Sequence, residues 1–434
     1  MRYWYVPHAG DYRDKITALI SSTADTPITI GEVKGNWSGW RPALEFKSVT
    51  VLDPNNRPAI KLDRIYGVLS WWSLLYGSIE FYRLEIDRPT LAIRRDKNGA
   101  LFLAGIKLPQ GDPTDDSGLA DWLLKQRSLA ISNATLSWQD AMVSDQALVL
   151  TDGGFLLENR GDQHNFGLAA RPPDEIANPI AVSGNVQGKT FSDLRNWRGE
   201  IQTHLQNIDL ATLRNFFPIP DELRRGSGGV KLTLTGDGRG HFGAITDLDL
   251  KNVQAQFNPT VAPLELAEVS GKVGVKHLTP GFEVTTDNLA VKWGSNKQSW
   301  RPGNAKIIFH PGEGNNPERG EITTKEIDLT GLLVVLQSVP LSTETHDQLH
   351  KFAPSGRLTN FIIGWTRTET KLSRYQLKGQ FQNLATSSLG DIPGVANMSG
   401  SIDANQNGGG IALDSKSMVV SIPSMFVGDL KFDT

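Results

Sequence analysis

The chain has 434 residues and a net charge of −3, with 39% hydrophobic and 21% charged residues. This composition excludes a disordered chain, and the interspersed charges offer no basic surface for nucleic acid. Since there is no cysteine, disulfides, thiolate metal sites and a cysteine nucleophile are excluded as well.

The first residues combine aromatic and basic side chains. The stretch "RYWY" at residues 2–5 resembles the aromatic and basic belt at a membrane interface, but a buried hydrophobic N-terminus explains it equally well. Asp11 to Thr23 then predicts an amphipathic helix, with Ile16, Leu19 and Ile20 on one face. No stretch of the chain reaches the roughly 18 apolar residues of a membrane span.

Strand patterns follow this helix. Residues 27–37 and 44–53 predict strands, and Trp71-Trp72 falls in a short helical turn. From Ser78 to Ile106 apolar side chains recur at every second position, which is the period of a strand with one dry and one wet face. Asn98-Gly99 predicts a hairpin turn within this stretch.

Residues 107–118 have the composition of a linker, and 119–126 predict a short helix before a strand at 129–140. From there to the end, we expect strands of about six residues, punctuated by Gly, Asn, Asp and Pro. The clearest are Val230–Leu234, Leu248–Leu250, Val253–Phe257, Phe282–Val284, Leu289–Trp293 and Phe361–Trp365. Short helices are expected at 210–217, 330–336 and 345–352.

A long internal repeat is visible in the second half. "RGEIQTHLQNIDL" begins at Arg198 and "RGEITTKEIDL" at Arg319, and each is followed by a glycine-containing turn and a strand. Each unit then reaches a Val/Met-Ser-Gly step, at residues 269–271 and 398–400, and residues 182–184 resemble a further copy. Repeats of this length predict modules that stack side by side and extend one sheet.

The motifs that suggest chemistry are weak. Residues 238–243 match the dinucleotide pattern G-x-G-x-x-G, but a strand pattern follows where a helix is needed, so a hairpin turn is expected. His346 and His350 lie four apart on a predicted helix, yet no third metal ligand is evident. We therefore predict no enzyme, no metal site and no cofactor.

A long sheet can hide its dry face against a second sheet, or curl into a trough whose occupant is not protein. The stretches "TPITIGEVKGNW", "LEFKSVTVLD" and "LSWWSLLYGSIEFYRLEIDRPTLAIRRDKNGALFLAGI" resemble the AsmA-like proteins of the Gram-negative envelope, in particular the YhdP branch. The match covers residues 2–106 and extends more loosely, through "LAVKW" at 289–293, to the C-terminus. These proteins are similar in architecture to eukaryotic chorein-type bridge proteins.

The resemblance implies a mainly β fold, in which a long twisted antiparallel sheet curls into an open, taco-like groove with a few short helices. We expect residues 1–106 to start the groove and 107–118 to link it to further segments at 119–197, 198–318 and 319–434. We expect a fragment that lacks an N-terminal membrane helix. We also expect that the C-terminal part is missing, because the alternation still continues at Thr434.

The function implied by the resemblance is to carry phospholipid along an apolar groove between the inner and outer membranes. The full-length protein is expected in the periplasm, anchored to the inner membrane, with phospholipid acyl chains as partners and an unidentified outer-membrane partner. An alternative, associated with the TamB branch, is a scaffold that binds outer-membrane protein strands by β-augmentation.

The candidate lining of the groove is the alternating apolar set, although each member also suits an ordinary protein core. These residues are Phe81, Leu84, Ile86, Leu91, Ile93, Phe102, Leu232, Leu234, Phe257, Phe282, Val284, Val291 and Phe361. Trp293 and Trp365 either close the edges of the trough or anchor their strands.

Overall fold

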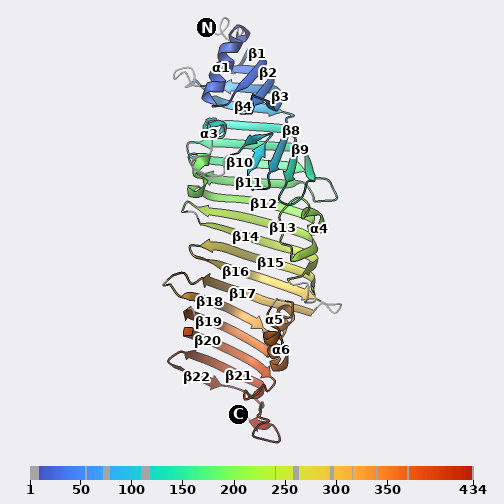
Figure 1. Ribbon diagram of the computed structural model, residues 1–434, viewed down its shortest axis with the longest axis vertical. Helices are drawn as coiled ribbons and strands as arrows, with labels where there is room; N and C mark the ends of the chain where they lie inside the picture. Colours follow the sequence, from blue (N-terminus) through green and yellow to red (C-terminus); the bar gives the residue numbers. More distant parts are fainter. Residues whose placement is uncertain are drawn as a thin grey trace. The chain divides into compact units, whose positions relative to one another are not determined.

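The fold is one open, mainly antiparallel β-sheet with a few short helices (Figure 1). The computed structural model describes residues 9–53, 56–71, 79–108, 118–239, 241–257, 263–293, 298–314, 316–338, 341–368 and 371–432. Within these residues 24 strands belong to the sheet, which confirms the predicted fold class. The predictions for residues 2–5, for Trp72 and for most of the 107–118 linker lie outside the described residues.

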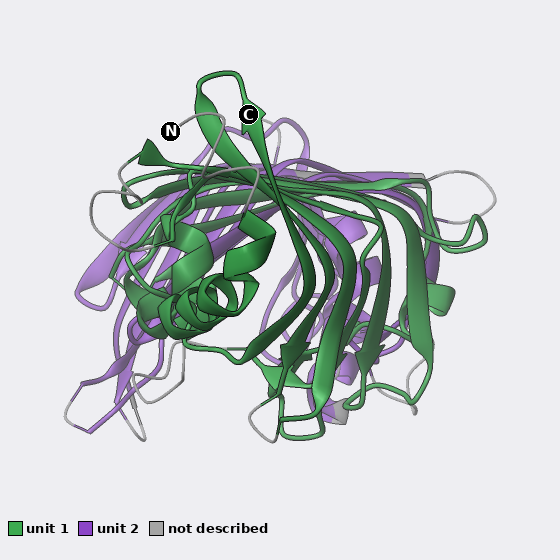
Figure 2. Cartoon of the chain, turned by 90° about the horizontal axis from the view of Figure 1, so that it is seen from above, with its two compact units in different colours: residues 1–219, 231–242 green, residues 220–230, 243–434 purple. Residues whose placement is uncertain are grey.

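The chain forms two compact units (Figure 2). Unit 1 contains residues 1–219 and 231–242, and the predicted five-part division stays a prediction beside it. Its strands are β1 (Ile28–Ser38), β2 (Arg41–Leu52), β3 (Pro58–Leu69), β4 (Phe81–Asp87), β5 (Thr90–Arg95), β6 (Leu101–Leu103), β7 (Ile106–Lys107), β8 (Ser128–Asp140), β9 (Ala147–Arg160), β10 (Gln163–Arg171), β11 (Ile180–Gln187) and β12 (Arg198–Asp209). Its helices are η1 (Ala9–Tyr12), α1 (Arg13–Thr23), α3 (Gly118–Lys125), η2 (Phe191–Asn196) and α4 (Leu210–Leu213).

Unit 2 contains residues 220–230 and 243–434, and β13 (Leu223–Asp237) contributes residues to both units. The remaining strands are β14 (Phe242–Ala255), β15 (Leu264–Leu278), β16 (Gly281–Trp293), β17 (Gln298–His310), β18 (Glu318–Asp328), β19 (Ser355–Thr368), β20 (Lys371–Thr386), β21 (Gly394–Asn405), β22 (Gly408–Leu413), β23 (Met418–Ser421) and β24 (Leu430–Phe432). The helices are α5 (Leu329–Leu336) and α6 (Thr343–Phe352).

The order of strand pairing follows the chain almost throughout. In unit 2 each strand from β14 to β21 pairs antiparallel with the next one in sequence. Two exceptions occur: in unit 1, β4 and β5 both pair with β8 in the parallel direction, and in unit 2, β21 pairs with β23 as well as with β22. A break at Arg88-Pro89, where Arg88 has a φ of +52°, separates β4 from β5.

The predicted helices are confirmed, with changes at their ends. The first begins as η1 and continues as α1, and it buries Ala9 and Ile20. The helix predicted at 210–217 ends at Leu213, so that prediction was too long. The hairpin at Asn98-Gly99 is confirmed, because Arg95 in β5 pairs with Leu101 in β6.

The predicted strand length of about six residues is wrong for most of the sheet. Strands β12 to β21 contain 11 to 16 residues. The segments expected as two strands at 282–284 and 289–293 are one strand, β16, which passes through a bulge at Asn288. The asparagines that predict turns therefore lie inside continuous strands.

These asparagines share one backbone conformation. Asn133, Asn207, Asn252, Asn288, Asn360, Asn383 and Asn397 all have φ between +50° and +56°. Several coincide with shifts of register, as at Asn133 in β8 and Asn360 in β19. Asparagine tolerates this left-handed conformation better than most residues, and a bulge bends its strand. Figure 2 shows strands of unit 1 turning part-way along their length.

Glycine completes the bend on the neighbouring strand. Gly271 in β15 has a φ of +116°, and a Cβ placed there would lie 2.5 Å from the carbonyl oxygen of Asn288. This explains the Ser-Gly step at 270–271 of the repeat. Gly184, in the Val-Ser-Gly sequence at 182–184, does not share this role, because it lies under the ring of Phe166 instead.

The long repeat corresponds to a shared local structure. In both copies a strand, β12 or β18, ends at an aspartate that caps a short helix. Asp209 accepts a hydrogen bond from the backbone N–H of Thr212, and Asp328 accepts one from Gly331. The residues around Gly238 form a hairpin turn between β13 and β14, as expected, with Asp237 accepting from the backbone N–H of Arg239.

We predict that Asn360→Val lowers the free energy of unfolding by about 1–2 kcal/mol, because a β-branched residue cannot adopt a φ of +50° without strain. Asn360→Gly should cost much less, since glycine adopts this conformation freely. Urea denaturation of the two variants tests this. Equal stability of the valine and glycine variants would show that the bulge is not strained.

Candidate functional site

A row of apolar side chains crosses unit 2 at right angles to its strands. Each residue of the row pairs directly with the next one on the neighbouring strand, from β14 to β21. The row is Ala244, Val275, Val284, Ile307, Ile322, Ile363, Leu377 and Ala404. Since cross-strand partners point to the same face, these side chains form one continuous apolar surface.

The middle of this row is not covered by the chain itself. Val275 is 47% exposed, Ile307 36% and Ile363 38%, and the other members are partly buried. Farther along the same strands, α5 packs against β17, β18 and β19. There Trp300 contacts Gly331 of α5, and Val291 and Phe361 are buried. The face thus has a covered part and an uncovered apolar row.

Unit 1 has a comparable row from β1 to β12. It contains Val33, Phe46, Ile65, Ile86, Ile131, Phe155, Leu168, Val182 and Thr203, each paired with the next. Val33 and Phe46 belong to a buried core that also includes Ile20 of α1 and Trp122 of α3. From Ile65 onward the members of the row are partly exposed.

An apolar cavity of about 170 Å³ lies within this core. Its walls come from α1, α3, β1 to β5, β6 and β8, and every side chain that lines it is apolar. A cavity with apolar walls gives water no hydrogen-bond partners, so it is expected to stay dry.

The structure brings four of the predicted lining residues to this cavity: Phe81, Leu84, Ile86 and Leu91. Phe81 is only 2% exposed, and its ring packs edge-on against Phe46 and Trp122. Phe81 is therefore firmly part of the protein core, whatever else it contacts.

The other two predicted lining residues of this region, Ile93 and Phe102, do not lie on the same face of the sheet. Ile93 pairs with Leu103 and Trp138, while Phe102 pairs with Arg94, whose guanidinium lies 5.7 Å from the Phe102 ring centre. Because Arg94 follows Ile93 directly, the two apolar side chains lie on opposite faces of this hairpin.

The predicted lining residues of the second half of the chain fall into different parts of the structure. Val284 is a member of the apolar row, and Phe282 lies two residues from it on the same face. Val291 and Phe361 are buried in the covered part of the face. Leu232 is partly buried and Leu234 is 43% exposed on β13, and the exposed Phe257 follows the end of β14.

Sequence reasoning missed several members of the apolar row, namely Val275, Ile307, Ile322, Ile363 and Leu377. Their strands do not alternate clearly: Ile307, Ile308 and Phe309 are consecutive apolar residues, and "EITTK" at 321–325 has Ile322 as its single apolar residue. The pairing between strands decides which residues share a row, and the sequence of one strand does not contain it.

Aromatic residues form a second row on the same face, nearer the strand ends. Phe282, Phe309, Gly320, Trp365 and Tyr375 pair in succession. The Phe282 and Phe309 ring centres lie 5.5 Å apart, and the Trp365 ring lies over Gly320, where a Cβ would clash with it. This row runs beside the apolar row, two residues nearer the strand ends.

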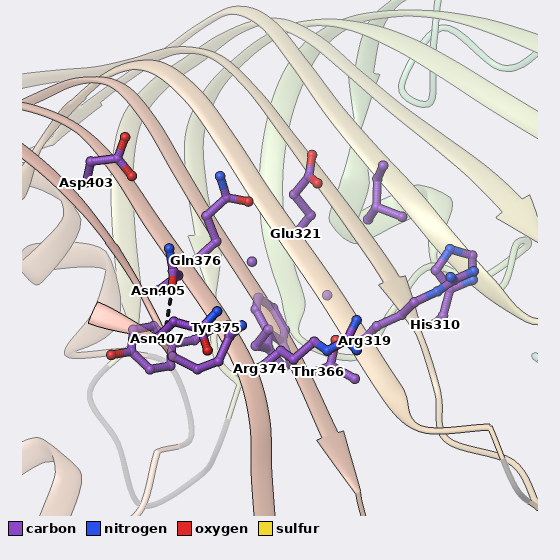
Figure 3. Close-up of a pocket in the computed structure, with 15 residues that line it drawn as sticks. His310, Arg319, Glu321, Thr366, Arg374, Tyr375, Gln376, Asp403, Asn405 and Asn407 are labelled. Carbon is purple, nitrogen blue, oxygen red and sulfur yellow. Dashed lines mark hydrogen bonds between the residues drawn. The ribbon is translucent and has the colours of Figure 1, made fainter. Parts of the chain in front are cut away.

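A polar pocket of about 610 Å³ lies at the same strand ends, mainly on the opposite face, and its lining also includes Gly320, Trp365 and Tyr375 of the aromatic row (Figure 3). One row of its lining, at the strand ends, is His310, Arg319, Thr366 and Arg374. A second row lies two residues farther from the strand ends on the same face. It contains Ile308, Glu321, Gly364, Gln376 and Asn405.

The described residues suggest neither a metal centre nor a membrane helix. No group of three or more histidine or acidic side chains among them is arranged to hold a metal ion. His346 and His350 line a small pocket with Leu333 and Leu349, between α5 and α6. None of the described helices combines the length and apolar character needed to cross a membrane.

These features define an open-sheet β-groove protein, in which an apolar row is left uncovered along a sheet that grows strand by strand. The sequence profile of the YhdP protein matches residues 1–434. The chain therefore belongs to the YhdP family of AsmA-like envelope proteins, as the resemblance predicted. Comparison with curated proteins and with solved structures gives no match.

We predict that Phe81→Ala lowers the free energy of unfolding by about 3–5 kcal/mol, because it removes a ring that fills the core against Phe46 and Trp122. Leu156→Ala, at a residue 48% exposed, should change it by less than about 0.5 kcal/mol. Denaturant titration measures both. An unchanged stability of the Phe81 variant would refute its place in the core.

We also predict that Glu318 titrates below the usual glutamate range. Hydrogen bonds from Arg367 and Trp365 stabilise its carboxylate and lower its pKa. The contribution to stability is therefore present above the ordinary glutamate pKa and lost as the pH falls through the lowered value. Arg367→Gln should raise this pKa, as measured by NMR of ¹³C-labelled glutamate, and an unchanged pKa would contradict the assignment.

Proposed function

We propose that this chain is a periplasmic segment of a protein that carries phospholipid along an apolar β-groove between the inner and outer membranes. The observation that supports the proposal best is the in-register row from Ala244 to Ala404, whose middle members stay exposed. A monomeric protein rarely leaves a contiguous apolar surface in water unless it binds a partner there.

The row suits hydrocarbon chains because of how its members are spaced. Neighbouring strands lie about 4.8 Å apart, so the row offers an apolar contact at each such step. A lipid with about 30 methylenes loses roughly 25 kcal/mol of burial on entering water, at ~0.8 kcal/mol per methylene. Moving from one step to the next exchanges one apolar contact for another, so the lipid slides without facing this cost.

Unit 1 supports the same function at its own row. The partly exposed residues from Ile65 to Thr203 continue from a core that contains the 170 Å³ apolar cavity. We propose that this cavity accepts the end of an acyl chain. Attachment to the inner membrane by a further segment, and an outer-membrane partner, are proposed from the family resemblance.

The proposal predicts that the chain, produced in the periplasm of a Gram-negative bacterium, is purified with phospholipid that mass spectrometry detects after extraction. Ile363→Glu should reduce photo-crosslinking between lipid and a benzoylphenylalanine at Ile307 by at least about fivefold, because it places a charge in the apolar row.

Ile362→Glu is the matched control, because Ile362 lies next in the chain, faces the other way and pairs with Lys378. It should leave crosslinking unchanged. A lipid-free wild-type chain, or equal loss in both variants, would refute the groove. Capture of extended polypeptide in place of lipid would favour the β-augmentation function.

A further inference from the structure

We propose that the polar pocket of unit 2 binds the phosphoethanolamine headgroup of a glycerophospholipid, with Arg319 and Arg374 holding the phosphate and Glu321 the amine. This inference rests on the proposed function and extends it to the headgroup. The site lies at the ends of β17 to β20, where the basic row alternates along each strand with the aromatic row, and Trp365 and Tyr375 of the aromatic row also line the pocket.

The two arginines have no acidic partner among the residues that the structure describes. Within the described residues no ion pair involves Arg319 or Arg374, whereas the nearby Arg367 and Lys378 pair with Glu318 and Asp403. Arg319 and Arg374 both pair with Thr366, one on each side, so their side chains flank the same threonine. Guanidinium groups bind phosphate oxygens with two parallel hydrogen bonds, which fits this arrangement.

The hollow of the pocket lies at Gly364, where no side chain is present. Gly364 lies between Glu321 and Gln376 in the inner row, and a Cβ placed there would meet no atom closer than 3.8 Å. The floor of the pocket is therefore backbone, while longer side chains rise on both sides (Figure 3). The hollow lies next to the phosphate-binding arginines rather than beneath them.

The pocket has an acidic part as well as a basic one. Asp403 is neutralised by Lys378 at 2.9 Å, whereas Glu321 accepts a hydrogen bond from the Thr323 hydroxyl at 3.3 Å and forms no ion pair with any described residue. Glu321 lies two residues from Arg319 on the same strand face, about 7 Å along the strand. Opposite charges at this separation match a zwitterion whose phosphate and amine are joined by a short linker.

The aromatic row explains how a lipid reaches this pocket. Phe309, Trp365 and Tyr375 lie on the apolar face at the same strand ends, beyond the apolar row. Aromatic side chains favour the boundary between hydrocarbon and water. A lipid with its acyl chains on the apolar row thus brings its glycerol to this edge, and its headgroup to the basic row on the other side.

The test compares binding of three short-chain probes to the 434-residue chain by calorimetry: dioctanoyl phosphatidylethanolamine, dioctanoyl phosphatidylglycerol and dioctanoylglycerol. The double variant Arg319→Gln/Arg374→Gln should bind both phospholipids about tenfold more weakly, because it loses charge-assisted hydrogen bonds to phosphate. Its binding of dioctanoylglycerol, which has no phosphate, should be unchanged.

The matched control is Arg225→Gln/Arg357→Gln, which removes two exposed arginines of unit 2 that pair with Glu265 and Glu326. It should bind all three probes like the wild type. Phospholipid binding that is insensitive to the Arg319 and Arg374 changes, with dioctanoylglycerol still bound, would overturn the headgroup site alone. A wild-type chain that binds none of the three probes would overturn the proposed function.

Two further variants test the shape and the acidic part of the pocket. Gly364→Leu should fill the hollow and weaken both phospholipids about as much as the arginine changes, whereas Gly167→Leu, at an open strand position of unit 1, should not. Glu321→Gln should weaken phosphatidylethanolamine binding and leave phosphatidylglycerol binding unchanged. Equal effects of Glu321→Gln on both lipids would refute its role with the amine.

Soluble O-phosphoethanolamine distinguishes a lipid site from a site for a free metabolite. We expect no displacement of dioctanoyl phosphatidylethanolamine at equal concentrations, because the soluble compound lacks the acyl contacts. Displacement at equal concentrations would show that the pocket serves a soluble ligand and would overturn the inference.

Discussion

The pairing of apolar residues across hydrogen-bonded strands is the constraint on which the rest of this structure depends. A strand alternates between two faces, so one shift of register by a single residue would move a member of the row to the wrong face. From β14 to β21 the register keeps an apolar residue at each step, although the strands differ in sequence. Both the uncovered row and the separate polar pocket follow from this alignment.

The bulges determine how far the alignment extends along each strand. An extra residue at Asn288 or Asn360 changes which face the following side chains occupy, and it bends the strand at the same place. Beyond the bulge at Asn288, Val291 lies on the same face as Val284 although the two are seven residues apart, and it is buried there. The bend thus separates a segment that the protein buries from one that it leaves open.

The sequence alone predicted the fold class, most elements and the family, because alternation and turn residues are local signals. It did not predict the long strands, because Asn252 and Asn288 look like turn residues when the φ angle is unknown. A signal was present: asparagine is followed by an apolar residue in "KNV", "DNL", "TNF" and "QNL". The uncovered row itself required the register between strands, which no single strand contains.

The strand-after-strand pairing of unit 2 has an evolutionary consequence. Because β15 to β20 each pair with the strands before and after them in the chain, loss or duplication of one hairpin there leaves every other pairing in place. Each antiparallel strand reverses the direction of the chain, so adding two strands leaves the direction of all later strands unchanged. The length of such a sheet can therefore change by one hairpin at a time, while the remaining strands keep their sequence and pairing.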